Sequence, residues 1–141
     1  MLRLYREQRW QSQDLADDLG GLLTDGFVRS GNCFFLQKLV PAEPAYGRVD
    51  FIDDTGFECF INSVHIDDYC ETDFIVQGSI FLEKVFARWN QLNANIPLRG
   101  IISETEFGAI VKFHVKRPNE YWIQEKDLEK FDEAMLLSDS C

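Results

Sequence analysis

The 141-residue sequence is poor in the residues from which most catalytic and cofactor sites are built. It has two histidines and four cysteines, and no two cysteines form a C-x-x-C pair. It also has no glycine-rich phosphate-binding motif, and no run approaches the roughly 20 apolar residues that cross a membrane. These absences predict a protein that is not an enzyme, has no cofactor or metal, and does not enter a membrane.

Basic residues are also scarce. Fourteen Lys and Arg stand against 24 Asp and Glu, so that the net charge is −10 and the isoelectric point is near 4.6. Residues 10–75 contain thirteen acidic and three basic residues, and the rest of the chain contains eleven of each. Binding to nucleic acid or to an anionic membrane requires clustered Lys and Arg. The charge argues against both and favours a basic partner.

The cysteines and the first residues bear on the cellular compartment. Cys33, Cys59 and Cys70 lie in or beside apolar segments, where a free cysteine usually serves as a small buried hydrophobe. The first ten residues alternate basic and apolar side chains, unlike the uncharged apolar run of a signal peptide. We therefore expect reduced cysteines and a cytoplasmic location.

The hydrophobic pattern predicts one α+β domain. The longest amphipathic run predicts a helix over residues 73–92, which should pack across a mainly antiparallel sheet. Strands are predicted at 27–28, 33–40, 98–103 and 109–116, and a hairpin at 49–66 with its turn at 53–56. A hydrophobic content of 45% with twelve Phe can fill such a core without disulfides or metal.

The two ends of the chain complete this prediction. A short strand is expected near Leu2–Tyr5, followed by a helix that Ser12 caps and whose apolar positions are Leu15, Leu19, Leu22 and Leu23. A C-terminal helix is expected over residues 125–137. The predicted domain therefore spans residues 1–137, and residues 138–141 are expected to form a flexible tail.

Histidine and cysteine could support chemistry in three ways. Cys59, His65 and Cys70 could bind zinc, but their spacing fits no common zinc motif, and burial or simple exposure is the stronger interpretation. Cys33 or Cys59 could act as a nucleophile beside a histidine, but an acidic environment raises a thiol pKa. The third alternative is a small enzyme that uses His65 and His114, with nearby carboxylates, as base and acid.

Carboxylates gather in three short segments, and these are the candidate binding residues. A solvated acidic face and a partner-binding surface are the main interpretations, ahead of a metal or catalytic site, because no EF-hand spacing accompanies them. Tyr69 lies inside the last segment and is the expected interface anchor, since interfaces favour exposed Tyr and Trp. The candidate partner-binding residues are Asp14, Asp17, Asp18, Asp53, Asp54, Asp67, Asp68, Tyr69, Glu71 and Asp73.

A small, strongly acidic α+β domain without catalytic motifs resembles the bacterial immunity proteins that neutralise toxins, including those of contact-dependent growth inhibition systems. The resemblance rests on size, charge and the lack of catalytic signatures over the whole chain. It implies a monomer that binds a cognate toxin domain, often a nuclease with a basic active site, through acidic residues. A structural subunit that oligomerises through the helix at 73–92 is a further alternative.

Overall fold

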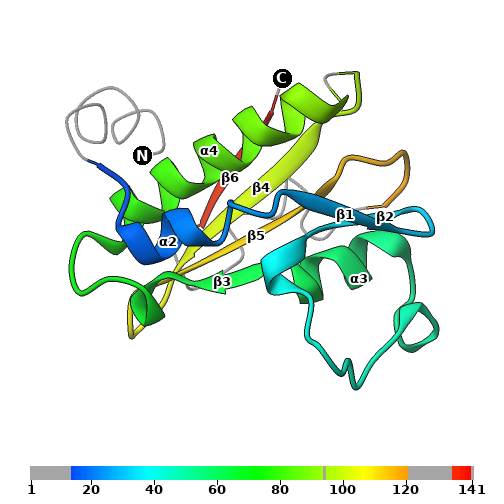
Figure 1. Cartoon of the computed structure of the whole chain (residues 1–141), viewed down its shortest axis with the longest axis horizontal. Helices are drawn as coiled ribbons and strands as arrows, with labels where there is room; N and C mark the ends of the chain where they lie inside the picture. Colours follow the sequence, from blue (N-terminus) through cyan, green and yellow to red (C-terminus); the bar gives the residue numbers. More distant parts are fainter. Residues whose placement is uncertain (1–13, 94, 121–134, 141) are drawn as a thin grey trace.

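The computed structural model describes residues 14–93, 95–120 and 135–140, and it confirms an α+β fold with antiparallel sheets (Figure 1). A two-stranded sheet pairs β1 (Phe27–Ser30) with β2 (Cys33–Leu36). A four-stranded sheet has the order β3-β5-β4-β6, with bounds Ser63–His65, Ala109–Val115, Leu98–Glu104 and Met135–Asp139. The helices are α2 (Asp17–Gly21), α3 (Asp54–Ile61) and α4 (Phe74–Asn93), with 3₁₀ turns η2 (Gln37–Leu39), η3 (Arg48–Asp50) and η4 (Ile66–Asp68).

Helix α4 packs across one face of the larger sheet, as its amphipathic pattern predicts. The approach is close, because a Cβ at Gly100 would clash with Leu82, and a Cβ at Gly78 would lie 3.1 Å from Val111. The apolar side of α4 is therefore buried inside the protein and is not free to serve as an oligomer face. Within the described ranges, no helix combines the length and apolar character needed to cross a bilayer.

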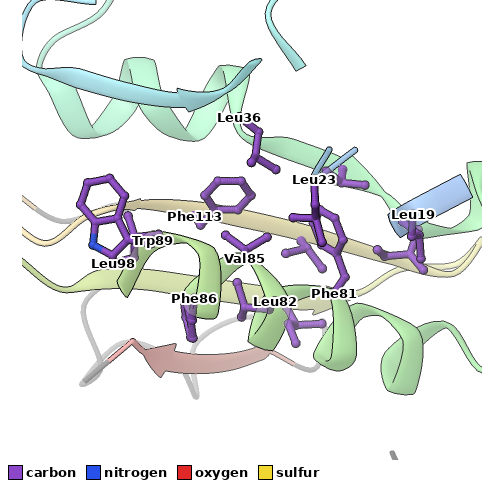
Figure 2. Packing of buried hydrophobic residues seen from close by; sticks show 14 of the residues in the cluster. Leu19, Leu23, Leu36, Phe81, Leu82, Val85, Phe86, Trp89, Leu98 and Phe113 are labelled. Atoms are coloured by element: carbon purple, nitrogen blue, oxygen red, sulfur yellow. The ribbon is translucent and has the colours of Figure 1, made fainter. Parts of the chain in front are cut away.

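The hydrophobic core lies between α4 and the sheet. Phe81, Val85 and Trp89 are fully buried on α4 and meet Phe113 of β5 (Figure 2). The same view shows that Leu36 of β2 reaches this cluster from the smaller sheet. One continuous core therefore joins both sheets to α4.

The N-terminal helix is shorter than predicted. α2 begins at Asp17, and Ser12, which was expected to cap it, lies outside the described residues. Leu19 and Leu23 are buried in the core as their spacing predicts. The helix ends after only five residues, and the glycines at its end lower the intrinsic stability of a helix.

The predicted hairpin over residues 49–66 is wrong, because residues 54–61 form α3. Asp53 is the N-cap of this helix, and its Oδ1 accepts a hydrogen bond of 2.7 Å from the backbone N–H of Gly56. The buried side chains are Thr55, Glu58 and Cys59, which follow helical spacing. Within the segment, only residues 63–65 form a strand, β3.

The prediction for the C-terminus is also wrong where the structure describes it. Residues 135–139 form β6, whereas 135–137 were predicted as helix and 138–139 as flexible tail. In this strand Asp139 pairs with Arg99 of β4, and Leu137 pairs with Ile101. The remainder of the predicted helix, and the strand predicted near Leu2–Tyr5, lie outside the described residues.

A buried polar network attaches α3 to both sheets. The side chain of Glu58 is fully buried, and its two oxygens accept backbone N–H groups of Phe34 (2.7 Å) and Val115 (2.8 Å). Both oxygens also accept hydrogen bonds of 2.8 Å from the guanidinium of Arg117. One turn later, Asn62 accepts from Leu36 N–H and donates to the carbonyl of Phe34. The network joins β2, α3 and the end of β5.

We predict that Arg117→Met lowers the free energy of unfolding by about 3–5 kcal/mol, because it leaves the Glu58 carboxylate buried without its counter-ion. The loss should be smaller at pH 5 than at pH 7, since an unpaired buried carboxyl takes up a proton more readily. Urea denaturation at both pH values measures the effect. Arg48→Met is the matched control, because it breaks the more exposed ion pair with Asp54 and should change stability little. Equal losses in both variants would contradict the central role of Glu58.

Candidate functional site

Three segments that carry carboxylates meet at the end of the molecule where α4 begins. They are residues 14–18, 67–73 and 104–108, so the predicted pair at 53–54 is not among them. Gln77 in the first turns of α4 holds the segment before α2, because it accepts from Ala16 N–H (2.8 Å) and donates to the carbonyl of Asp14 (3.0 Å). The turn between β4 and β5 packs on η4 so closely that a Cβ at Gly108 would lie 2.7 Å from Asp67. Residues 14–18, 67–73 and 104–108 therefore share one end of the fold (Figure 1).

We call this surface the acidic end. Its three segments contain no Lys or Arg, and every one of its carboxylates except Asp67 belongs to an exposed residue. Asp67 is half-buried, and within the described part of the chain its Oδ1 has no hydrogen-bond partner. The acidic end comprises Asp14, Asp17, Asp18, Asp67, Asp68, Glu71, Asp73, Glu104 and Glu106.

An exposed aromatic side chain stands among these carboxylates. Phe107, at the tip of the β4–β5 turn, is 76% exposed. The hydroxyl oxygen of Thr105 accepts from the N–H groups of Phe107 (3.3 Å) and Gly108 (3.1 Å), which holds the turn in place. Sequence reasoning placed the anchor at Tyr69, but that ring is half-buried against the core. The sequence does carry a signal for Phe107, which is a single aromatic residue between Glu106 and the turn glycine Gly108.

The structure separates two of the predicted binding residues from the rest. Asp53 and Asp54 lie at the start of α3, and Figure 1 shows α3 toward the other end of the molecule from α2. Asp53 caps the helix, and Asp54 accepts a hydrogen bond from Arg48 that lowers its pKa. Both carboxylates therefore have structural partners. The other seven predicted acidic residues, with Tyr69 between them, belong to the acidic end.

The two histidines are too far apart to act as a catalytic pair. His65 of β3 is directly opposite Ile110 of β5, so it shares a face of the sheet with His114, four residues further along β5. Four residues of strand span about 13 Å, whereas a proton relay needs hydrogen-bond contact. His65 is exposed and His114 is 2% exposed. The arrangement gives no support to an enzyme that uses both.

Cys33 and Cys59 have the properties of buried structural residues. Burial, together with the charges of Glu58 and Asp54, raises the pKa of Cys33 to about 12. Burial likewise raises the pKa of Cys59. Thiols in such surroundings are poor nucleophiles at neutral pH. Among the residues that the structure describes, no three His, Cys, Asp or Glu side chains are grouped to hold a metal ion.

His114 is a buried imidazole in the neutral form. Its Nδ1 lies 2.8 Å from the carbonyl oxygen of Val115, to which it can donate. Burial lowers the pKa of His114, and the charges of Arg117 and Arg99 lower it further, against the hydrogen bond to Val115, which raises it. Unfolding therefore makes this side chain easier to protonate.

We predict that His114 makes the protein less stable as the pH falls below about 6.5, the pKa of an unperturbed histidine. The sign follows because the folded-state pKa is depressed, so that the unfolded chain binds the proton first. The midpoint of urea unfolding should fall between pH 7 and pH 5.5, and His114→Gln should flatten this slope. His65→Gln is the control, because His65 is exposed, and it should keep the wild-type slope. The same slope in all three proteins would contradict the assignment.

Comparisons with known proteins match the chain over almost its whole length. Uncharacterized protein PM0498 of Pasteurella multocida (strain Pm70) is 27% identical over 134 residues, which cover 87% of this chain and 83% of that protein. No solved structure gives a significant match. The family match spans residues 1–141, and the chain belongs to the Uncharacterized protein PM0498 family.

Proposed function

We propose that this chain is a cytoplasmic immunity protein, which binds a cognate basic toxin domain through the acidic end and blocks it. The observation that supports this most is Phe107, a 76% exposed aromatic side chain at the tip of a turn that lies among carboxylates from three segments. Binding surfaces often combine an apolar anchor at the centre with charged groups around it. The protein acts by occupying the toxin surface and carries out no chemistry.

The charge of this surface suits a partner that handles anionic substrates. A nuclease presents Lys and Arg to the phosphates of its substrate. A surface of nine carboxylates without a base in the same segments can occupy such a site as a mimic of nucleic-acid charge. Electrostatic steering raises association rates from roughly 10⁵–10⁶ to as much as 10⁸–10⁹ M⁻¹s⁻¹ at low salt. The acidic end is therefore suited to fast capture of a toxin.

The acidic end is also held in place before binding. Gln77 ties the segment before α2 to α4, and Thr105 closes the turn that carries Phe107. The packing of Gly108 on Asp67 then connects this turn to η4. A surface that is already ordered loses less conformational entropy on binding than a loop that must fold. This pre-organisation favours a tight complex.

We predict that Phe107→Ser weakens binding to the cognate toxin domain by about 30-fold or more, because loss of a central anchor costs about 2 kcal/mol. The partner to use is a candidate toxin domain chosen from the products of the genes that flank the gene of this chain, and titration calorimetry gives the affinity. Val49→Ser is the matched control, because Val49 is 93% exposed and lies before α3. If both variants bind as the wild type does, Phe107 is not the anchor.

We predict that Asp68→Lys slows association at low salt by about tenfold or more and reduces the dependence of the rate on salt. Stopped-flow kinetics with the same toxin domain measures this. Glu43→Lys makes the same change in charge on the loop before α3 and should have a smaller effect. Asp68 is preferred to Asp67 for this test, because Asp67 packs against Gly108 and a longer side chain there would disturb the turn. Equal slowing by both variants would point to net charge alone.

The function itself is tested by co-expression of this chain with that toxin domain. Restored growth of the host and a one-to-one complex on gel filtration are the expected results. Growth arrest without a complex would overturn the proposal for that pair. Restored growth by a Phe107→Ser, Asp68→Lys double variant at wild-type level would keep the immunity role but move the binding surface elsewhere.

A further inference from the structure

A pocket of about 340 Å³ lies at the opposite end of the β4–β5 hairpin from Phe107. Its lining includes Arg99 at the start of β4, His114 near the end of β5, and Lys116 and Arg117 just after β5, together with Glu120. Small-molecule sites usually have volumes of about 300–1,000 Å³. The pocket is large enough for a small ligand, and its lining is rich in basic side chains although the chain as a whole is acidic.

One polar atom of the lining has no hydrogen-bond partner among the residues that the structure describes. His114 is 2% exposed, and its Nδ1 lies 2.8 Å from the carbonyl of Val115, but its Nε2 is buried without a hydrogen bond. Most buried polar side-chain atoms in proteins do have a hydrogen-bond partner. With Nδ1 donating to Val115, Nε2 of the neutral ring can accept a hydrogen bond, and after protonation it can donate one.

The basic side chains around the pocket differ in how many of their hydrogen-bond donors are already used within the protein. The guanidinium of Arg117 donates hydrogen bonds to both carboxylate oxygens of Glu58. Glu120 accepts a hydrogen bond of 3.1 Å from the N–H of Thr55. Arg99 is 5% exposed and binds Asp139 through two nitrogens, at 2.8 and 3.1 Å. The same Asp139 accepts from Nζ of Lys116 at 3.0 Å. One carboxylate thus serves two cations.

Lys116 is the basic residue best placed to bind a further anion. Its side chain is 42% exposed, and an ammonium group has three N–H donors, only one of which is needed for Asp139. Oxygen atoms of phosphate and carboxylate groups are the usual acceptors for such donors. Lys116, a partly exposed cationic donor, and His114, whose Nε2 is buried, therefore line the same cavity.

We propose that this pocket binds a small ligand through an oxyanion group, phosphate or carboxylate, which contacts Nζ of Lys116 and Nε2 of His114, and that His114 takes up a proton from solvent as the ligand binds. In the free protein, burial and the charges of Arg117 and Arg99 hold the ring neutral. An anion beside Nε2 raises the pKa of the ring, because an opposite charge favours the protonated form. The proton returns to solvent when the ligand leaves.

The other charged groups near the ring set the conditions for this uptake. Arg117 after β5 and Arg99 on β4 oppose a positive charge on His114, whereas Asp139 on β6 favours it, and Lys116 lines the same pocket. Glu58 of α3 is already paired with Arg117, and Glu120 is bonded to the backbone of α3. Burial and the two guanidinium groups together keep the pKa of the ring low in the free protein, so an anion beside the ring promotes uptake of the proton. This site does not depend on the proposed immunity function.

Titration calorimetry on the whole chain at pH 7 tests the proposal, with inorganic phosphate in one arm and malonate in the other, at constant ionic strength maintained with sodium chloride. Two buffers of different ionisation enthalpy report the number of protons taken up. We expect saturable one-site binding of at least one probe with uptake of a fraction of a proton. Binding of phosphate alone or malonate alone identifies the anion class, and absence of binding by both overturns the proposal.

Variants distinguish binding of the anion at this site from nonspecific attraction of anions to basic side chains. Lys116→Gln should weaken binding about tenfold, whereas Lys84→Gln, an exposed position on α4, should leave it unchanged. His114→Phe should abolish the proton uptake. NMR of the wild-type ring covers the case in which that variant fails to fold: the probe should shift Nε2 of His114 from an unprotonated to a protonated nitrogen. An unchanged Nε2 resonance at saturating probe would overturn the proposal.

Discussion

Glu58 is the buried charge on which the arrangement of the other elements depends. A carboxylate without contact with water is costly, and burial raises the pKa of Glu58 more than Arg117 and the backbone donors lower it. The folded chain retains the group by filling both oxygens with hydrogen bonds from Phe34, Val115 and Arg117. These partners come from β2, β5 and the segment after β5. Because all of them must be in place together, the small sheet, α3 and the large sheet are fixed relative to one another.

This constraint also determines where the charged surfaces face. With Arg117 held by Glu58, the segment after β5 places Lys116 beside Asp139 and forms one wall of the pocket. The same two strands, seven residues long, carry the Glu104–Phe107 turn at their other end. One hairpin thus presents carboxylates and an exposed ring at one end and basic side chains at the other. A charge separation of this kind would orient the protein toward the basic partner that we propose, and it leaves the pocket away from the acidic end.

The sequence predicts the elements whose burial follows a simple period. α4 has a long apolar pattern on one face, β4 and β5 are runs rich in apolar residues, and the predicted bounds of all three agree with the structure to within a few residues. α3 was mistaken for a strand because its buried positions include Thr55 and Glu58, polar residues that an apolar period does not count. β6 was mistaken for helix for a related reason. Its core contact is mainly Leu136, and its pairing with β4 depends on residues about 35 positions away in sequence.

The candidate surface was predicted in part, because sequence reasoning divided the charge between two halves of the chain. That division identified the acids of residues 14–18 and 67–73 but assigned Glu104 and Glu106 to a neutral part of the chain, although they belong to the turn that packs on Asp67 through Gly108. It also hid the basic end, since Arg99, Lys116 and Arg117 are balanced in sequence by acids that lie elsewhere in space. A net charge counted along the chain adds up residues that can lie far apart in the folded structure. What a partner meets is the local charge, and here the fold alone brings three separate segments into one acidic surface.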